Sequence, residues 1–450
     1  MKKNLLPGWF PELSPLDQAI ENQIKDIIRE TYETYWYFNI ETPAIEYNEV
    51  LIAKWWEEVS KQIFWLYWLK QWAEDLKNYS LRFDLTVPLA RYIVQNEDSI
   101  QFPFKRYQIQ KVWRWERQQK WRFKEFTQCD IDIIWTDLSL NYDIEIIETL
   151  DMTLKNIFNK LRIGKKFEIR VNNKKFLDSI SEYFKIKWKD KDLFYRLLDD
   201  YYKISKDEFM DRLKDITCSW KILLDILETW EIREIESENI INSFKETFLL
   251  IDSLKNKWVN VKFDPFITRW LDYYTWTVFE TFLVDYPEFW SICSGWSYDN
   301  LVNSIREISW MKVVSDKKNY WWVGWSIWLT RLFSRFKDNN LINTEIPLAQ
   351  AMIFNVPWNS TYYIDKIAKK LRESWISTDV YYGNEKLAKQ FSYAESKKIL
   401  FWIFAGTEEE RTNSVILKDL KSKQNQTIDF DAICIEIFKK LNSAAWAYEL

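Results

Sequence analysis

The chain has 450 residues, of which 47 % are hydrophobic and 29 % charged, and its formal net charge at pH 7 is −4. This length is too great for one ordinary hydrophobic core and predicts two or three domains. The charge excludes a uniformly basic nucleic-acid coat protein, although a local basic face could still contact RNA. The chain has no histidine, so an enzyme here would depend on carboxylates, Arg, Lys, Tyr and bound ions.

The cysteines and the hydropathy pattern indicate the cellular compartment of the protein. Cys129, Cys218, Cys293 and Cys434 are far apart and match no metal-ligand spacing, so we interpret them as reduced thiols. The start Met1–Pro7 lacks the apolar core of a signal peptide, and no stretch approaches 18 uncharged apolar residues. We expect a cytoplasmic protein with no metal site of its own.

Tryptophan and glycine occur in unusual numbers, 28 and 6. An average protein of this length has roughly thirty glycines. Several tryptophans stand in turn-like contexts that favour glycine, such as Lys54–Glu57 and Ser294–Ser297. We therefore hypothesise that the gene uses a genetic code that reads UGA as glycine, and that the printed chain translates UGA as tryptophan. A truly tryptophan-rich protein is the alternative.

The first half of the chain predicts helices and a hairpin. Residues 14–35 have apolar positions at helical spacing, and Leu81–Pro88 alternates like a strand that ends at Pro88, before a short helix. Residues 104–135 alternate in two runs, which predicts an antiparallel hairpin with a long cationic connection. We expect a helix at 139–160, an extended segment at 167–172, and a mainly helical insertion at 174–258.

In the second half of the chain, the predicted secondary-structure pattern changes near residue 346. Strand-like patterning covers 261–284, and two further motifs lie at 290–301 and 320–334. Beyond them, strands and helices alternate, with strands at 351–356, 378–381 and 399–404 and helices at 362–372 and 385–393. This alternation predicts a small α/β domain with a largely parallel sheet.

The predicted hairpin holds the densest group of chemistry-bearing residues. These are Arg114, Glu116, Arg122, Phe126 and Gln128. Alternate side chains of a strand share a face, so Arg114 should point with Glu116, and Phe126 with Gln128. A guanidinium can bind two phosphate oxygens and an aromatic ring can stack on a base. A solvated charged loop is the alternative interpretation of the same residues.

These residues resemble the second signature motif of class II aminoacyl-tRNA synthetases, and Phe104–Asp130 as a whole resembles histidyl-tRNA synthetases. Arg269–Trp276 is similar to that family's Arg-Gly-Leu-Asp-Tyr-Tyr-x-Gly, with both tryptophans on family glycines, in agreement with the recoding hypothesis. Ser294–Asp299 is similar to Gly-Gly-Arg-Tyr-Asp, although Ser297 replaces the basic residue. Val323–Leu332 is similar to the third class II motif, and the resemblance covers nearly the whole chain.

The resemblance implies an α+β class II synthetase catalytic domain, an antiparallel sheet flanked by helices, over residues 1–340. A helical insertion at 174–258 would interrupt it, and an α/β anticodon-binding domain would follow at 346–450. Pro43 falls in the first class II motif, which lies at the dimer interface in the family, so a homodimer is implied. The implied reaction is ATP-dependent activation of histidine to histidyl-adenylate, then transfer to the 3′ end of histidine tRNA.

An alternative within the same resemblance is a histidine-binding regulatory subunit of ATP phosphoribosyltransferase. Such paralogues usually lack the anticodon-binding domain and lose motif arginines. This chain keeps Arg114, Arg269 and Arg331 together with a C-terminal domain. A generic RNA-binding protein on the same scaffold is a further alternative.

Carried over position by position, the resemblance implies roles for individual residues. The catalytic residues would be Arg114 and Arg269, on either side of the α-phosphate, and Gln128. ATP, with Mg²⁺ bound through its phosphates, would contact Arg114, Glu116, Arg122, Phe126 and Arg331. Histidine would contact Asp84, Thr86, Gln128, Asp132, Arg269, Tyr273, Tyr274 and Tyr298. Asp84 and Asp132 are each one methylene shorter than the family's usual Glu, so their reach stays open. Taken alone, Tyr273 and Tyr274 would be core aromatics and Arg331 a surface arginine.

Overall fold

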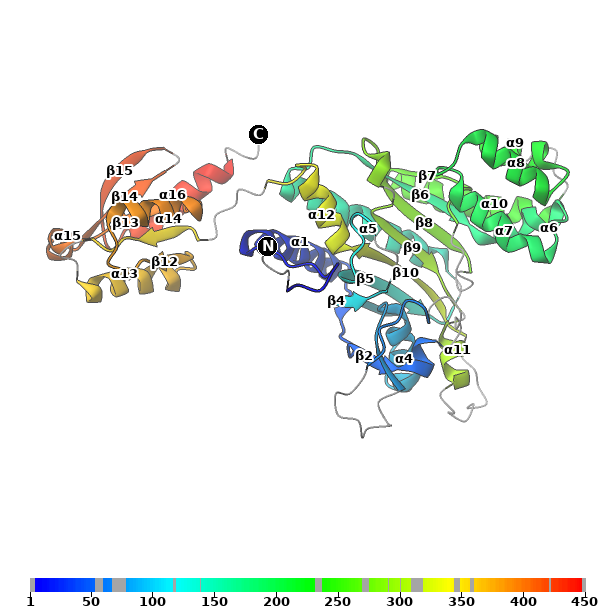
Figure 1. The fold of residues 1–450 in the computed structure, drawn as a ribbon, viewed down its shortest axis with the longest axis horizontal. Coiled ribbons are helices and arrows are strands. Elements are labelled where there is room, and N and C mark those ends of the chain that lie inside the picture. Colours follow the sequence, from blue (N-terminus) through cyan, green and yellow to red (C-terminus); the bar gives the residue numbers. More distant parts are fainter. Residues whose placement is uncertain are drawn as a thin grey trace. The chain divides into compact units, whose positions relative to one another are not determined.

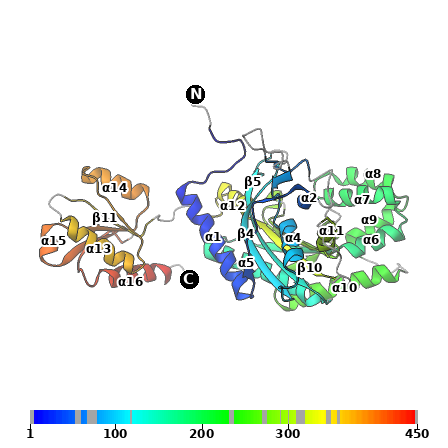
Figure 2. The same ribbon diagram turned by 90° about the horizontal axis from the view of Figure 1, so that it is seen from below.

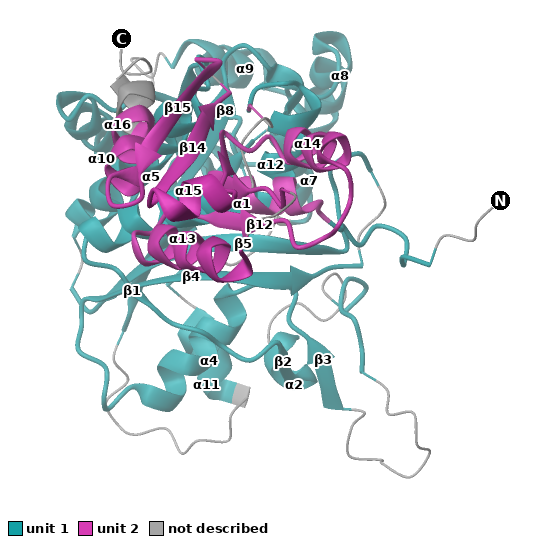
Figure 3. Cartoon of the chain, turned by 90° about the vertical axis from the view of Figure 1, so that its left-hand side faces the viewer, with its two compact units in different colours: residues 1–12, 21–342 teal, residues 13–20, 343–450 magenta. Residues whose placement is uncertain are grey.

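The computed structural model describes residues 5–52, 60–66, 78–115, 119–137, 139–230, 237–268, 275–289, 291–299, 301–308, 319–343, 349–356, 360–420 and 422–446. The chain divides into two compact units (Figure 3). Unit 1 consists of residues 1–12 and 21–342, and unit 2 of residues 13–20 and 343–450.

Unit 1 is built on an eight-stranded sheet with the order β1-β4-β5-β10-β9-β8-β6-β7 (Figure 1). Its strands are β1 (Phe38–Asn39), β4 (Phe104–Trp113), β5 (Glu125–Trp135), β6 (Phe167–Asn173), β7 (Val261–Phe263), β8 (Thr277–Leu283), β9 (Cys293–Ser297) and β10 (Trp321–Trp328). Pairing is antiparallel from β4 to β6 and parallel only at the two ends, β1 with β4 and β6 with β7. The predicted class II catalytic fold is therefore confirmed.

Helices flank this sheet. They are α1 (Pro15–Thr34), α2 (Asn48–Leu51), α4 (Thr86–Asn96), α5 (Leu140–Leu161), α11 (Leu301–Ile308) and α12 (Leu329–Asp338), with a short 3₁₀ turn η2 (Pro287–Phe289) and a small sheet of β2 (Ile45–Tyr47) and β3 (Tyr79–Leu81). The helix expected at 14–35 is confirmed as α1, and its apolar positions Ile20, Ile24 and Ile28 are buried. The hairpin expected at 104–135 is confirmed as β4 and β5.

The chain between β6 and β7 is helical, as predicted for 174–258. Its described helices are α6 (Lys174–Tyr183), α7 (Trp188–Asp200), α8 (Lys206–Ile216), α9 (Trp220–Thr229) and α10 (Glu238–Asn256). Figure 2 shows α6, α7, α8 and α9 grouped at one side of unit 1. The sheet thus remains continuous through the pairing of β6 with β7 on either side of this helical segment.

The strand predicted over Leu81–Pro88 is wrong beyond its first residue. β3 ends at Leu81, and α4 begins at Thr86 with Pro88 in its first turn. The first N–H groups of a helix have no acceptor within it, so proline is tolerated there. The Oδ1 atom of Asp84 accepts a hydrogen bond from the Val87 N–H at 3.1 Å, which satisfies one of these donors.

Unit 2 is an α/β unit whose sheet has the order β12-β11-β13-β14-β15. Its strands are β11 (Ala351–Ile353), β12 (Thr378–Val380), β13 (Phe401–Phe404), β14 (Ser414–Asp419) and β15 (Gln424–Asp429), and its helices are α13 (Thr361–Glu373), α14 (Leu387–Ser396), α15 (Thr407–Arg411) and α16 (Ile433–Trp446). β12, β11 and β13 are parallel, whereas β14 and β15 pair antiparallel. The sheet is therefore mixed rather than largely parallel. The connection between β14 and β15 is too short for the crossover that a parallel pair needs.

Tryptophan repeatedly takes a left-handed backbone conformation. Twelve described residues other than glycine have positive φ, and six of them are tryptophans: Trp9, Trp36, Trp121, Trp230, Trp258 and Trp375. A bulky residue is rare in this region, which glycine enters without a steric cost. Half of the left-handed positions therefore carry one of the residues least suited to them.

Three of these tryptophans end helices in the same way. After α10, the Trp258 N–H donates to Lys255 O at 2.9 Å and the next N–H to Leu254 O at 3.1 Å. The same pair of bonds follows α1 at Trp36 and α13 at Trp375. This is the Schellman arrangement, in which the left-handed residue is usually glycine.

Candidate functional site

One face of the unit 1 sheet collects polar side chains where β4, β5 and β10 run side by side. In register, Arg106 lies opposite Asp132, Gln108 opposite Asp130, and Gln110 opposite Gln128; across β5, Gly324 lies opposite Asp132 and Ser326 opposite Asp130. Side chains alternate along a strand, so these even-numbered residues share one face. Six of the polar ones are buried: Arg106, Gln108, Gln128, Asp130, Asp132 and Ser326. Buried charges and amides at this density are typical of a functional site.

The carboxylate of Asp132 is the centre of this face. Its Oδ2 lies 2.6 Å from Nη2 of Arg106, and its Oδ1 accepts hydrogen bonds from the Tyr298 hydroxyl and, at 2.8 Å, from Nε1 of Trp322. Burial raises the pKa of Asp132, and the Arg106 guanidinium opposes that shift. A Cβ atom at Gly324 would collide with this carboxylate, so only glycine fits opposite it. Asp132 and Tyr298, both predicted to bind histidine, are thus in direct contact.

Asp84 and Thr86 stand at the start of α4. Besides capping the helix through Val87, Asp84 is desolvated, and this burial raises its pKa to about 6. Thr86 is half-buried as the first residue of the helix. Both predicted histidine-binding residues therefore lie on a segment whose position depends on how α4 is held against the sheet.

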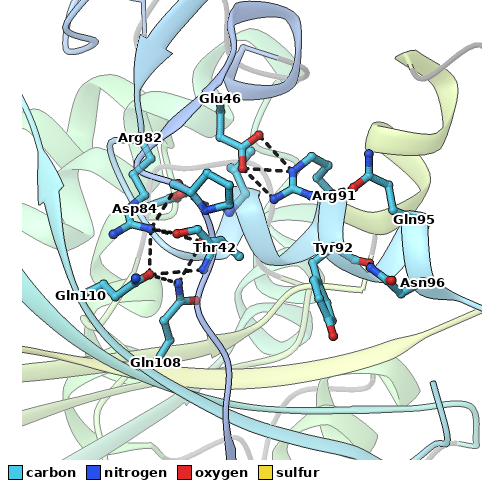
Figure 4. A network of polar contacts seen from close by, with 12 residues as sticks. Thr42, Glu46, Arg82, Asp84, Arg91, Tyr92, Gln95, Asn96, Gln108 and Gln110 are labelled. Atoms are coloured by element: carbon cyan, nitrogen blue, oxygen red, sulfur yellow. Dashed lines mark hydrogen bonds and ion pairs between the residues drawn. The ribbon is translucent and has the colours of Figure 1, made fainter. Parts of the chain in front are cut away.

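A network around Arg82 holds that segment (Figure 4). Nη1 of Arg82 donates to Thr42 O at 2.6 Å and to Gln110 Oε1 at 2.8 Å, and its Nε donates to Lys111 O at 3.0 Å. Arg91 of α4 forms an ion pair with Glu46 of β2 at 2.9 Å. Arg82 is two residues before Asp84, so these bonds tie the loop that carries Asp84 both to β4 and to the segment around residue 42.

Three residues predicted to bind ATP surround one indole ring. The guanidinium carbon of Arg114 lies 5.3 Å from the ring centroid of Phe126 and 5.6 Å from that of Trp328. The guanidinium carbon of Arg331 lies 4.0 Å from the same Trp328 centroid. Arg114 is also fixed by a hydrogen bond from its Nε to Phe83 O at 2.8 Å. The structure therefore brings Arg114, Phe126 and Arg331 together at the ends of β4, β5 and β10.

Gln128 and Arg122 differ in setting. Nε2 of Gln128 donates to Ser326 Oγ at 3.1 Å, whereas its Oε1 is buried without a hydrogen-bond partner. Such a group is costly to bury and is expected to find a partner when a ligand binds.

Arg122 is exposed on the connection between β4 and β5. Burial lowers the pKa of the neighbouring Arg335 to about 10, and the charge of Arg122 adds to that shift.

Four predicted site residues, Glu116, Arg269, Tyr273 and Tyr274, lie outside the described residues. Conversely, the prediction did not include Arg106, Trp322 or Trp328. A signal for Arg106 was present, because alternation over 104–113 places it on one face with Gln108 and Gln110. The two tryptophans join the site through strand pairings that the sequence does not reveal.

Among the described residues, no helix combines the length and the apolar character needed to cross a membrane. Within the same residues, no cluster of three or more Cys, Asp or Glu side chains is arranged to hold a metal ion.

Comparisons with known proteins agree with the resemblance found in the sequence. The family model described as histidyl-tRNA synthetase matches residues 10–309, and that described as anticodon binding domain matches residues 350–440. The chain is 37 % identical to a histidine–tRNA ligase of Clostridium tetani, with 98 % of each chain covered. It is 35 % identical to one of Finegoldia magna, with 98 % of this chain and 100 % of the relative covered.

Solved structures give the same result. The crystal structure of histidyl-tRNA synthetase from Nostoc sp. PCC 7120 matches with a TM-score of 0.84 and 30 % identity, covering 98 % of this chain and 100 % of that one. An ATP phosphoribosyltransferase regulatory subunit/histidyl-tRNA synthetase from Bacillus halodurans matches with a TM-score of 0.68 at 20 % identity, over 87 % of this chain and 96 % of that one, which shows a shared fold alone. On its family model and its relatives, the chain belongs to the histidyl-tRNA synthetase family.

Proposed function

We propose that this protein joins histidine to its tRNA in two steps, with ATP as the energy source. The observation that carries the proposal is the gathering of Arg114, Phe126 and Arg331 around one ring position, on the same sheet as the Asp132 cluster. One part offers cations and an aromatic face to a nucleotide, and the other offers buried hydrogen-bonding groups to a small polar ring.

The first step is a reaction at phosphorus that needs no general base, because the histidine carboxylate is ionised at neutral pH. A carboxylate oxygen attacks the α-phosphorus of ATP, the bond to the bridging oxygen breaks, and pyrophosphate leaves with that electron pair. Arg114 and Arg269 would neutralise the charge that develops on the α-phosphate. Glu116, Arg122, Phe126 and Arg331 would hold the base and the outer phosphates. Mg²⁺, held by the phosphate oxygens, supplies further neutralisation when bound.

The second step transfers the acyl group. A hydroxyl oxygen of the terminal tRNA ribose attacks the carbonyl carbon of histidyl-adenylate, the hydroxyl proton is released, and AMP leaves with the electrons of the broken bond between the carbonyl carbon and its phosphate oxygen. Unit 2 would contact the anticodon of the same tRNA. We assign residues 1–340 to the catalytic domain, 174–258 to its insertion and 346–450 to the anticodon-binding domain.

Recognition of histidine would rest on the polar face of the sheet. Its imidazole both donates and accepts hydrogen bonds, and Asp132, Tyr298, Tyr273 and Tyr274 would supply the partners. Arg106 acts as a positioning residue through its ion pair with Asp132. Asp84, Thr86 and Gln128 would bind the backbone groups of the amino acid, and the unpaired Oε1 of Gln128 supports this role.

We also propose a cytoplasmic homodimer that uses the surface around Pro43. Phe38, Ile45 and Tyr47 flank this proline and are 55 %, 46 % and 48 % exposed, which is typical of apolar side chains that a partner covers. Sedimentation of the purified protein would test the dimer.

We propose, in addition, that the native protein carries glycine at most of the positions printed as tryptophan, because its gene reads UGA as glycine. The six left-handed tryptophans and the three Schellman caps support this proposal. Mass spectrometry of peptides from the native protein is the test. Glycine is expected at positions 258, 276 and 375, and tryptophan there would refute the recoding.

The experiment for the activity is histidine-dependent exchange of pyrophosphate into ATP, with the protein made from a gene that encodes glycine at the suspected positions. Exchange with histidine alone among the amino acids is the expected result. Histidine binding without exchange would point instead to a regulatory paralogue, and RNA binding without ATP turnover to a generic RNA-binding protein.

A further inference from the structure

The side chain of Trp322 lies among the residues proposed to hold the substrate imidazole. It is fully buried, its Nε1 donates to Asp132 Oδ1 at 2.8 Å, and its ring centroid is 4.4 Å from that of Tyr298. The five-membered ring of an indole carries one N–H donor, as a neutral imidazole does. Trp322 therefore makes with Asp132 the contact that is expected of bound histidine.

A second indole lies among the residues proposed to hold adenine. Trp328 has the Arg331 guanidinium 4.0 Å from its ring centroid on one side, and Phe126 with a centroid separation of 6.3 Å on another. Arg114 is 5.6 Å from the same indole. An indole resembles a purine in being a planar pair of fused rings, and Trp328 takes the cation–π contact with Arg331 and an edge-on contact with Phe126, whose ring plane is inclined at 61°, in the place proposed for the base.

Both tryptophans stand on the same face of β10. Side chains alternate along the strand, so positions 322, 324, 326 and 328 point to the polar face, and the middle two are Gly324 and Ser326. With a small residue at 322 and 328, the strand would present an unbroken run of small side chains to this face. The two indoles are thus the bulky exceptions along the strand that underlies the site.

We propose that, in the chain with tryptophan at both positions, the side chains of Trp322 and Trp328 occupy the places of the histidine imidazole and the adenine ring, so that each indole excludes one substrate until a small residue replaces it. This inference rests on the proposed function, because that function identifies the two ring positions. A packed interior has no room for a second ring beside the first, and histidine or ATP could enter only if the indole left its contacts. Residue 322 then decides histidine binding and residue 328 decides nucleotide binding, each independently of the other.

The test compares three full-length proteins. The first, the five-glycine protein, carries glycine in place of Trp115, Trp276, Trp296, Trp322 and Trp328; the second retains Trp322 and the third retains Trp328. Calorimetric titration with L-histidine and, separately, with AMP measures binding. Retaining Trp322 should weaken histidine binding by about 100-fold or more and leave AMP binding unchanged, and retaining Trp328 should do the reverse. Equal affinities in all three proteins would overturn the inference.

The outcomes separate this inference from the proposed function. If the five-glycine protein binds both ligands but exchanges no pyrophosphate, the proposed activity fails while the occupancy of the two ring positions stands. If it exchanges pyrophosphate and the protein that retains Trp322 still binds histidine equally well, the inference fails alone. Circular dichroism verifies that each protein is folded.

Single changes in the printed chain provide a second route should the five-glycine protein not fold. Trp322→Ala should gain histidine binding, whereas Trp322→Phe, which keeps a ring in place, should not. Trp402→Ala removes an indole that is equally buried in unit 2 and serves as the matched control, with no expected gain of either ligand. A gain of histidine binding in Trp402→Ala would contradict the assignment of position 322.

Discussion

The two sheets of this protein bury different kinds of side chain. In unit 2, alternate residues of β11 and β13 enter two apolar clusters, Ile353 and Ile403 in one and Met352 and Trp402 in the other. In unit 1, one face of β4 and β5 buries an ion pair and several amides instead. Burying charge opposes folding unless each charge is paired, so an apolar face would be the simpler way to stabilise a sheet.

The difference separates a sheet that serves stability from a sheet that also serves chemistry. Asp132 and Arg106 are positioned by cross-strand register, and their burial makes each sensitive to loss of the other. Ile403 has only to fill space. Five predictions test this contrast.

Asp132→Ala should have the largest effect, because it leaves the Arg106 guanidinium buried without its counter-ion. We expect the free energy of unfolding to fall by about 3–5 kcal/mol. Urea unfolding of the two proteins provides the measurement. The double variant Arg106→Met with Asp132→Leu is the control and should recover most of the loss, since neither charge then remains. A single variant as stable as the parent would mean that the ion pair contributes nothing.

Arg114→Ala should act on the reaction and little on the fold. Because removal of one preorganised cation from a developing oxyanion slows the chemical step by about 10²- to 10³-fold, we expect that loss in pyrophosphate exchange when the change is made in the five-glycine protein. Arg114→Lys is the matched variant, and it should recover only part of the rate because it cannot bind two oxygens at once. Unchanged exchange in Arg114→Ala would remove this residue from the mechanism.

Ile403→Ala should reduce stability and leave the activity unchanged. Ile403 is fully buried in the sheet of unit 2, and its truncation should destabilise that unit by about 3 kcal/mol. Hydrogen exchange of the β11 and β13 amides measures the local effect, and the same change in the five-glycine protein should leave its rate of pyrophosphate exchange unaltered. A large fall in pyrophosphate exchange would contradict the separation between the two sheets.

Asp143 should make unit 1 less stable as the pH rises. Burial raises the pKa of this carboxyl in the folded protein to about 6, against about 3.9 in an unfolded chain. Between these values the folded state holds a proton that the unfolded state has lost, so the free energy of unfolding falls from about pH 4 to pH 7, by roughly 2–3 kcal/mol. Urea unfolding across this range should show the fall, and Asp143→Asn should reduce it by this amount, while the fall that remains belongs to Asp84 and Asp132, whose pKa values burial also raises. An equal slope in both proteins would assign the dependence to other groups.

Trp375→Gly should have the smallest effect, a gain. Trp375 ends α13 at φ 59° with 93 % of its surface exposed, so the indole contributes little packing while its Cβ strains the backbone. Relief of this strain should raise the free energy of unfolding by about 1 kcal/mol. Ser374, its neighbour at φ −90°, is the control, and Ser374→Gly should bring no gain. An equal effect of the two changes would contradict the proposed backbone strain at Trp375.

Long periodic segments were predictable from the sequence, and pairings between distant segments were not. α1, α5, β4 and β5 follow apolar spacings within ten to twenty residues. β15 was missed because five of its six residues are exposed, so no apolar alternation marks it. The pattern predicts that a strand ends at Pro88, because proline usually breaks regular structure, whereas the first turn of a helix accepts proline.

The candidate site was predictable in its residues and not in its contacts. Asp132 and Tyr298 came from motifs, but their direct hydrogen bond depends on how β9 and β10 pair with β5. The same pairing brings Trp322 onto Asp132 across 190 positions. The composition indicated that the number of tryptophans is unusual. Only the strand register shows that two of them, Trp322 and Trp328, lie where the substrates are proposed to bind.

The distance along the chain between contacting residues also bears on when the site forms. Asp132 meets Tyr298 across 166 positions, Gln128 meets Ser326 across 198, and Thr127 meets Thr330 across 203. Contacts between residues so far apart in the sequence form late in folding, because closing the long loop between them costs conformational entropy. During synthesis the β4–β5 hairpin emerges long before β10, so the nascent chain has no complete substrate site until most of unit 1 has left the ribosome.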